Sequence, residues 1–151
     1  LFEFQKRSKR VVLIQKLIDT LIVKIEGIEV SLFTYPYKLL KRLIKTEYIN
    51  LISIEDIAAM KMVAIVQRGI QRDFIDLYFL IKCLGLAKIF HLTEKKYPPF
   101  NKYIGLQAIT YFGDAEVSLG RKLTLFESLT WQEIKNFIIG EAKKFKKILK
   151  E

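Results

Sequence analysis

The stretch from Asp56 to Leu80, DIAAMKMVAIVQRGIQRDFIDLYFL, contains the residues whose types and spacing best suit chemistry. Lys61 stands in a segment that is apolar on nearly every side of a helix. At about 100 degrees per residue, Arg68 lies almost in line with Lys61. A helix without a polar face is expected to be buried, and a buried ammonium is costly unless an anion meets it. The pattern therefore predicts an anionic group beside these two cations.

The sequence leaves open what that anion is. The small residues Ala58 and Ala64 flank Lys61 and would leave room for a bound group. Alternatively, the lysine could reach solvent along its aliphatic stem, or it could pair with a carboxylate of a neighbouring segment. A bound phosphate and an internal ion pair are both compatible with the spacing.

A second group of charges follows directly, at Arg72, Asp73 and Asp76. Carboxylates three residues apart on a helix face the same way, so they could receive a lysine, orient a base or bind a cation. The alternative is an ordinary surface pair between Arg72 and Asp76, which would contribute little to stability. Gly69 predicts a short turn, which should bring Arg68 close to Arg72 and Asp73.

The elements that position these residues are predicted as strands first and helices after. Strands are expected over about 11–35, because TLIVKIEGIEVSLF alternates around Gly27 as an antiparallel hairpin does. Pro36 begins a loop or a short helix. Ser53, followed by Asp56, resembles a capping pattern and predicts a helix over about 54–68 that stops at Gly69.

Further helices are predicted to the end of the chain. The apolar residues of the next one recur at intervals of three and four until Gly85, and LAKIFHLTEKKY and NKYIGLQAITYF supply two more. Thr130 and Glu133 form a capping box before the final helix, at whose start Trp131 should cover the core. We therefore expect an α+β protein with N-terminal antiparallel strands and helices over about 54–150, forming one domain over 1–151.

Composition restricts the classes of function. With 51% hydrophobic residues the chain should fold, and its net charge of +10 favours polyanionic partners such as nucleic acid or nucleotides. A single cysteine, Cys83, excludes an internal disulfide, and the single histidine, His91, leaves no zinc cluster. Cys83 is expected in the core and His91 on a helix surface. The lack of a disulfide fits a reducing cytoplasm. No apolar run is long enough for a membrane span, so a soluble protein is expected.

The segment DIAAMKMVAIVQRGIQRDFIDLYFL, preceded by VSLFTYPYKLL and followed by YFGDAE, resembles the AbiEii-type nucleotidyltransferases. These are toxins of abortive-infection and type IV toxin–antitoxin systems, and the resemblance runs from about Thr20 to the C-terminus. It implies a polymerase-beta-like nucleotidyltransferase fold and transfer of a nucleotide from Mg²⁺-bound NTP to an acceptor such as tRNA or another RNA. A cognate antitoxin is an implied partner.

The resemblance also implies roles for the charged residues. Lys61, Arg68 and Arg72 would bind the triphosphate, while Asp73 and Asp76 would orient Lys61 or assist the acceptor.

The chain departs from the family pattern in its metal site. Such enzymes need a Gly-Ser loop followed by an Asp-x-Asp pair that holds magnesium. No Gly-Ser occurs here, the acid-x-acid triplet is Asp114-Ala115-Glu116 near the C-terminus, and Ser31 stands where a third acid is expected. No metal ligand is therefore predicted, although Mg²⁺ is expected of the family.

This departure leaves alternatives. The sequence resembles the C-terminal two-thirds of such an enzyme or a degenerate relative, and the alternative function is an RNA- or partner-binding module without catalysis. Exposed strand edges in an incomplete sheet would favour a homodimer.

Overall fold

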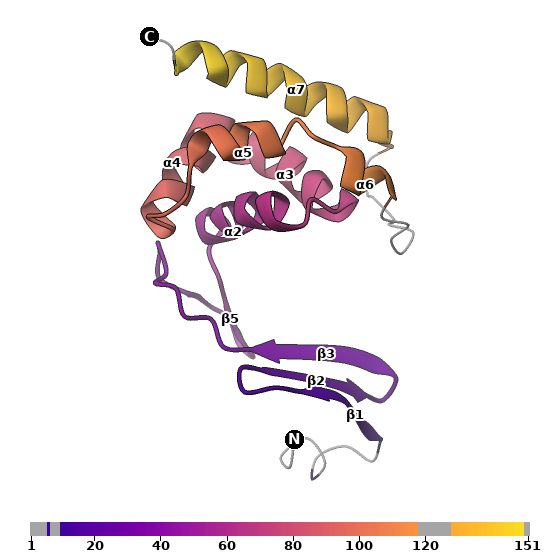
Figure 1. Cartoon of the computed structure of the whole chain (residues 1–151). Coiled ribbons are helices and arrows are strands. Elements are labelled where there is room, and N and C mark those ends of the chain that lie inside the picture. Colours follow the sequence, from indigo (N-terminus) through magenta and orange to yellow (C-terminus); the bar gives the residue numbers. More distant parts are fainter. Residues whose placement is uncertain (1–5, 7–9, 118–127, 150–151) are drawn as a thin grey trace. The chain divides into compact units, whose positions relative to one another are not determined.

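Strands precede helices along the chain, as the sequence predicted for an α+β protein. The structure is a computed structural model that describes residue 6 and the ranges 10–117 and 128–149. Its internal contacts divide the chain into two compact units, Leu1–Tyr37 and Lys38–Glu151. Figure 1 shows strands in the first unit and a group of helices in the second.

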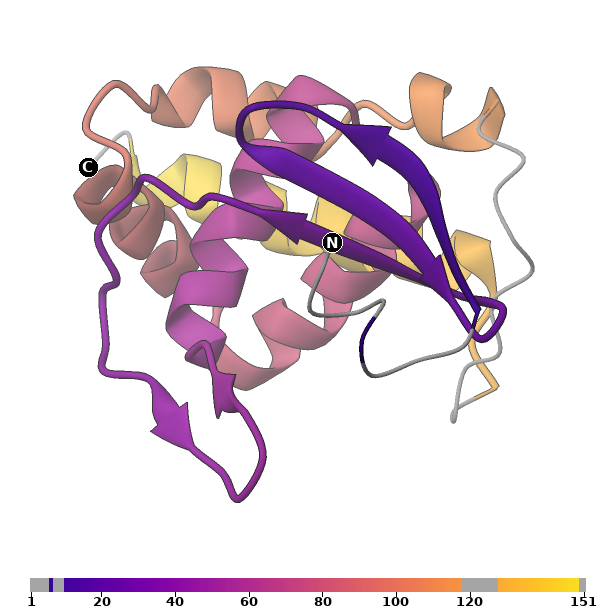
Figure 2. The same ribbon diagram turned by 90° about the horizontal axis from the view of Figure 1, so that it is seen from below.

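The first unit is a three-stranded antiparallel sheet with the order β1-β2-β3 (Figure 2). The hairpin predicted around Gly27 is confirmed: Ile25 pairs with Ile28, and Glu26 and Gly27 have positive φ angles of 48° and 88°. Two left-handed residues suit the twist of a two-residue hairpin loop. A further strand precedes the predicted pair, in a segment whose apolar residues do not alternate. The strands are β1 (Val11–Lys16), β2 (Thr20–Ile25) and β3 (Ile28–Phe33).

The second unit begins with a loop, one of the two alternatives that the sequence indicated. A short antiparallel ladder follows, in which β4 (Ile44–Lys45) pairs with β5 (Asn50–Leu51). The Thr46 amide donates to the Ile49 carbonyl at 3.1 Å and closes the turn between the two strands. This ladder leads directly into the helices.

The predicted caps and glycine stops lie at helix ends, but the helix predicted in NKYIGLQAITYF already ends at Ala108. The Ser53 side chain accepts from the Asp56 amide at 3.0 Å, and Thr130 and Glu133 form the predicted capping box. Gly69 and Gly85 follow their helices with positive φ angles of 50° and 79°. The short α6 was not predicted. The helices are α2 (Ile54–Gln67), α3 (Gln71–Leu84), α4 (Leu86–Lys96), α5 (Lys102–Ala108), α6 (Gly113–Val117) and α7 (Trp131–Ile148).

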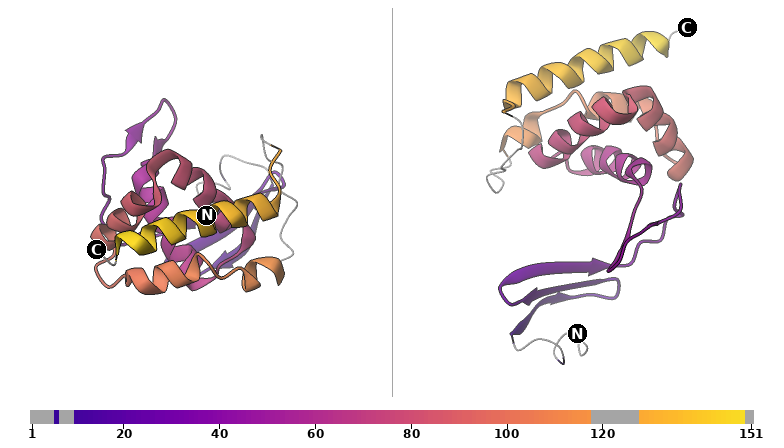
Figure 3. Two further views of the ribbon diagram at one scale, coloured as in Figure 1. Left: turned by 90° about the horizontal axis from the view of Figure 1, so that it is seen from above. Right: turned by 180° about the vertical axis from the view of Figure 1, so that it is seen from behind.

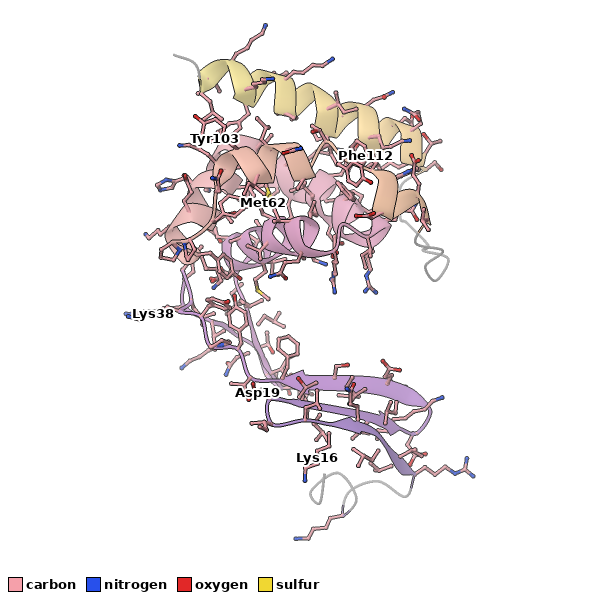
Figure 4. The ribbon with its side chains drawn as sticks, viewed as in Figure 1. Lys16, Asp19, Lys38, Met62, Tyr103 and Phe112 are labelled. Atoms are coloured by element: carbon pink, nitrogen blue, oxygen red, sulfur yellow. The ribbon has the colours of Figure 1, made fainter. Side chains whose placement is uncertain are left out.

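The helices of the second unit surround one apolar core. α2 packs against α3, α4 and α5, whereas α7 packs against α3 and α4 on the other side (Figures 1 and 3). Met62, labelled in Figure 4, is fully buried in this core. The rings of Phe90 and Phe145 stack with centroids 4.4 Å apart, and Trp131 packs edge-on against Phe74. The expected contact of Trp131 with the core is confirmed.

The cysteine and the histidine both lie at the surface. His91 is exposed on α4, as predicted. Cys83 is exposed on α3, so its predicted place in the core is wrong. Two helical positions beyond Ile81 correspond to about 200 degrees, which carries Cys83 away from the buried stripe. Within the described residues, none of the helices has the length and apolar character needed to cross a bilayer.

Candidate functional site

The carboxylate of Asp73 is the centre of the charged cluster. It lies in the first turn of α3 and its side chain is fully buried. The Lys61 ammonium donates to Asp73 Oδ1 at 3.1 Å. The Arg68 guanidinium donates through Nε to Oδ2 at 2.8 Å and through Nη2 to Oδ1 at 3.1 Å, as a two-pronged pair. Residues from the middle of α2, its C-terminus and the start of α3 therefore meet at one carboxyl group.

Lys61 has a second carboxylate partner. Its Nζ lies 2.5 Å from Asp76 Oδ2, and the side chains of Lys61 and Asp76 are 24% and 40% exposed. The two aspartates are three residues apart on α3, so both reach the same side. The sequence left open which anion lies beside Lys61. In the protein without a ligand, the anions are the carboxylates of Asp73 and Asp76.

The ionisation of Asp73 reflects this arrangement. Burial by itself would raise the pKa of Asp73, but the hydrogen bonds from Arg68 and Lys61 outweigh it and hold that pKa below its ordinary value. The same contact, chiefly the hydrogen bond to Asp73, raises the pKa of Arg68. Asp73 is therefore a carboxylate, and Arg68 is cationic, throughout the physiological range.

The remaining residues singled out around Lys61 are placed differently. Arg72 is exposed on α3, and no ion pair to it is found among the described residues, so the expected pair with Asp76 does not form. Ala58 is fully buried in the core, so it does not provide open space next to Lys61. Ala64 is half-buried. As far as the described residues show, Arg72 is therefore an exposed cation without an ion pair, beside a cluster whose other charges are paired.

A second buried ion pair was missed by the sequence reasoning. The Lys96 ammonium, at the end of α4, lies 2.5 Å from Asp56 Oδ1, and both side chains are fully buried. Lys96 also donates to the Lys38 carbonyl at 2.8 Å. The amides of Leu40 and Lys41 donate to Asp56 at 2.9 and 3.2 Å. The pair therefore fastens the segment before β4 to α2 and α4.

The sequence indicated a structural role for Asp56 but not for its partner Lys96. Asp56 was recognised as part of a helix cap, and the Ser53 hydroxyl does donate to its Oδ2 at 2.7 Å. In a capping box the acidic side chain would bind the amide of the cap residue. Here its oxygens bind Leu40, Lys41 and Lys96 instead, because α4 lies alongside α2. Burial would raise the pKa of Asp56, but these hydrogen bonds, led by that of Lys96, lower it.

The described residues do not supply a magnesium site. Among them, no group of three or more His, Cys, Asp and Glu side chains is placed to hold a metal ion. The oxygens of Asp73 are occupied by Lys61 and Arg68. Of the acid-x-acid triplet on α6, Glu116 pairs with Lys135 at 2.7 Å. The donor set of the described residues therefore does not fit Mg²⁺.

The comparisons with known proteins agree with the resemblance. A family model described as "Nucleotidyl transferase AbiEii toxin, Type IV TA system" matches residues 20–148. A curated relative, an uncharacterized protein of Aquifex aeolicus, is 34% identical over 131 residues, which are 84% of this chain and 62% of that relative. The chain thus spans less than two-thirds of the relative's length. No solved structure matches the chain significantly.

Proposed function

Because the chain belongs to the AbiEii nucleotidyl transferase toxin family of type IV toxin–antitoxin systems, we propose that it transfers a nucleotide from an NTP to an RNA acceptor. The observation that carries the proposal is the cluster of Lys61 and Arg68 on Asp73. tRNA is the acceptor class that we propose first. A cognate antitoxin and Mg²⁺ are proposed on family membership alone.

The cations of this cluster are suited to bind phosphate. Nucleotidyl transfer builds negative charge on the departing pyrophosphate, and fixed cations lower that barrier. The Arg68 side chain is 53% exposed and uses its Nε and Nη2 donors on Asp73, so its other N–H groups remain for a ligand. Arg72 lies one helical turn before Asp76 and is exposed. Lys61, Arg68 and Arg72 would together bind the triphosphate.

The two aspartates have different roles in this proposal. Asp73 is fully buried, so it acts as a positioning residue that holds Lys61 and Arg68 in a fixed geometry. Asp76 is partly exposed and competes with a phosphate for Lys61. An arriving triphosphate would take the place of Asp76 at the ammonium, while the bond from Lys61 to Asp73 persists.

The test is the loss of the Lys61 ammonium. In the protein expressed from its whole reading frame, Lys61→Ala should reduce transfer of labelled nucleotide to RNA by about a hundredfold or more, because one preorganised charge is lost at the phosphates. Incorporation of label from α-labelled NTP into a tRNA pool measures the rate. Arg68 still pairs with Asp73 in this variant, so the fold should persist.

The matched control is Lys88→Ala, which removes one exposed lysine from α4 and should leave transfer unchanged. A circular dichroism melt verifies that both variants are folded. Transfer at the wild-type rate in the Lys61→Ala protein would remove Lys61 from the mechanism. Absence of transfer by the wild-type protein would instead favour the binding-module alternative.

A further inference from the structure

A groove lies between α5 and α7, which are in the same compact unit as the charged cluster. Its cavity has a volume of about 550 Å³, within the usual range for ligand sites. The floor is apolar, and the lining comes from Leu106, Ile139 and Ala142 together with polar side chains at the rim. No residue of the Lys61 cluster lines it, so it is a separate site.

The rim has the groups that a nucleotide needs. The Tyr103 ring, labelled in Figure 4 on α5 below α7, is 64% exposed and offers a face for a base. Gln107 provides amide donors and an acceptor. Lys143 and Lys146, on α7, are exposed lining residues for which no ion pair is found within the described ranges. Their charges are available for phosphates.

The groove continues along α5 into a second hollow. This hollow has a volume of about 440 Å³, shares Gln107 and Thr110 with the first, and is bordered by Tyr111. The side chain of Tyr111 is 60% exposed. Each hollow thus has one exposed tyrosine, and polar groups lie between them. Such a repeat suits a ligand with successive bases better than a single small molecule.

We propose that the α5–α7 groove binds an unpaired segment of RNA. One base stacks on Tyr103, the next base reaches Tyr111, and the phosphates meet Lys143 and Lys146. The inference rests on the proposed function for the choice of RNA, and on the groove itself for the position. An acidic amphipathic helix is the competing occupant, but it would leave the exposed aromatic faces and the amide of Gln107 without matched partners.

Binding of a fluorescein-labelled, unstructured eight-nucleotide RNA to the whole chain tests the proposal. Fluorescence anisotropy is measured without NTP, so the result does not depend on whether transfer occurs. Tyr103→Ala should weaken binding about tenfold, the usual effect of losing one stacking platform, whereas Tyr103→Phe should stay within about threefold. A blunt RNA duplex should bind more weakly than the single strand, because its bases are already stacked.

Matched charge variants separate the groove from the net positive charge. Lys143→Gln with Lys146→Gln should weaken binding at least about fivefold more than Lys144→Gln with Lys147→Gln on the same helix. Equal losses of RNA affinity in the two double variants, or unchanged RNA affinity in Tyr103→Ala, would overturn the proposal. Competition arms with mononucleotides and with an acidic amphipathic peptide complete the test. Stronger binding of either competitor than of the RNA would also overturn it.

Discussion

The Asp73 carboxylate determines where two cations lie, because it accepts from both Lys61 and Arg68 while excluded from solvent. Removing one member of such a buried pair leaves the others without compensation. Asp76 cannot replace Asp73, since it is partly exposed and contacts only Lys61 among these cations. The geometry of the candidate site therefore depends on one side chain that a substrate would not touch.

Asp73→Asn should lower the free energy of unfolding at pH 7 by about 2 kcal/mol, since hydrogen bonds to charged groups contribute that much. The folded pKa of Asp73 lies below its ordinary value, so its stabilisation is complete above about pH 4. That stabilisation is lost as the pH falls through the lowered folded pKa. Urea unfolding is measured at pH 7 and at successive values below about pH 4. The difference in free energy of unfolding between wild type and Asp73→Asn should become smaller as the pH falls.

The exposed Asp114→Asn is the control for this measurement, and it should change the free energy of unfolding by less than about 0.5 kcal/mol. A difference between wild type and Asp73→Asn that stays constant with falling pH would show that the charge of Asp73 is not what stabilises the cluster.

At the scale of elements, the ion pair of Asp56 and Lys96 joins α2, α4 and the segment that leads into β4. Lys96→Met should lower the free energy of unfolding by about 3–5 kcal/mol, because it leaves the Asp56 carboxylate buried without a cation. Lys102→Met is the comparison, since Lys102 pairs with Glu94 at 3.6 Å on the surface. Lys102→Met should lower the free energy of unfolding by less than about 1 kcal/mol.

Urea denaturation measures both lysine variants. If Lys96→Met and Lys102→Met lower the free energy of unfolding by similar amounts, the Asp56 carboxylate is solvated or rearranges in the Lys96→Met protein. Restoration of stability by Asp56→Asn in the Lys96→Met background would support the stated cause, because the buried charge is then removed.

Two glycines in helices test how closely the elements pack. A Cβ added at Gly105 on α5 would lie 2.5 Å from the Phe100 ring and 3.0 Å from that of Phe90, whereas one at Gly140 on α7 would meet nothing within 4 Å. Gly105→Ala should therefore lower the free energy of unfolding by about 1–3 kcal/mol. Gly140→Ala should raise it by about 0.5–1 kcal/mol, through the lower entropy of the unfolded chain. Thermal melts give both, and a stabilising Gly105→Ala would show that Phe100 moves aside.

At the scale of the whole molecule, positive charge is in excess and only part of it is compensated. Lys61, Arg68 and Lys96 are each paired with aspartates, so these ion pairs contribute nothing to the net charge of +10. The excess lies on exposed residues, including Arg72, Lys143 and Lys146. These are the charges that the proposed nucleotide and RNA partners would meet.

Features that depend on residues close together in the chain could be predicted from the sequence. The hairpin at Gly27, the cap at Ser53 and the capping box at Thr130 all use contacts across a few positions. The alignment of Lys61 with Arg68, and the closeness of Arg68 to Asp73 across a short turn, follow from helix geometry in the same way. For that reason the order of strands and helices and most of the charged cluster could be predicted.

Contacts between groups that are distant in the chain became known only from the three-dimensional structure. Lys61 is met by aspartates, Asp56 finds Lys96 forty positions away, and the groove arises only because α5 lies beside α7. Cys83 falls outside the core for the same kind of reason, since the burial of a helix position depends on which faces its neighbours cover. Contacts between remote segments leave no periodic signal in a single sequence, because their spacing along the chain is set by the packing of whole elements.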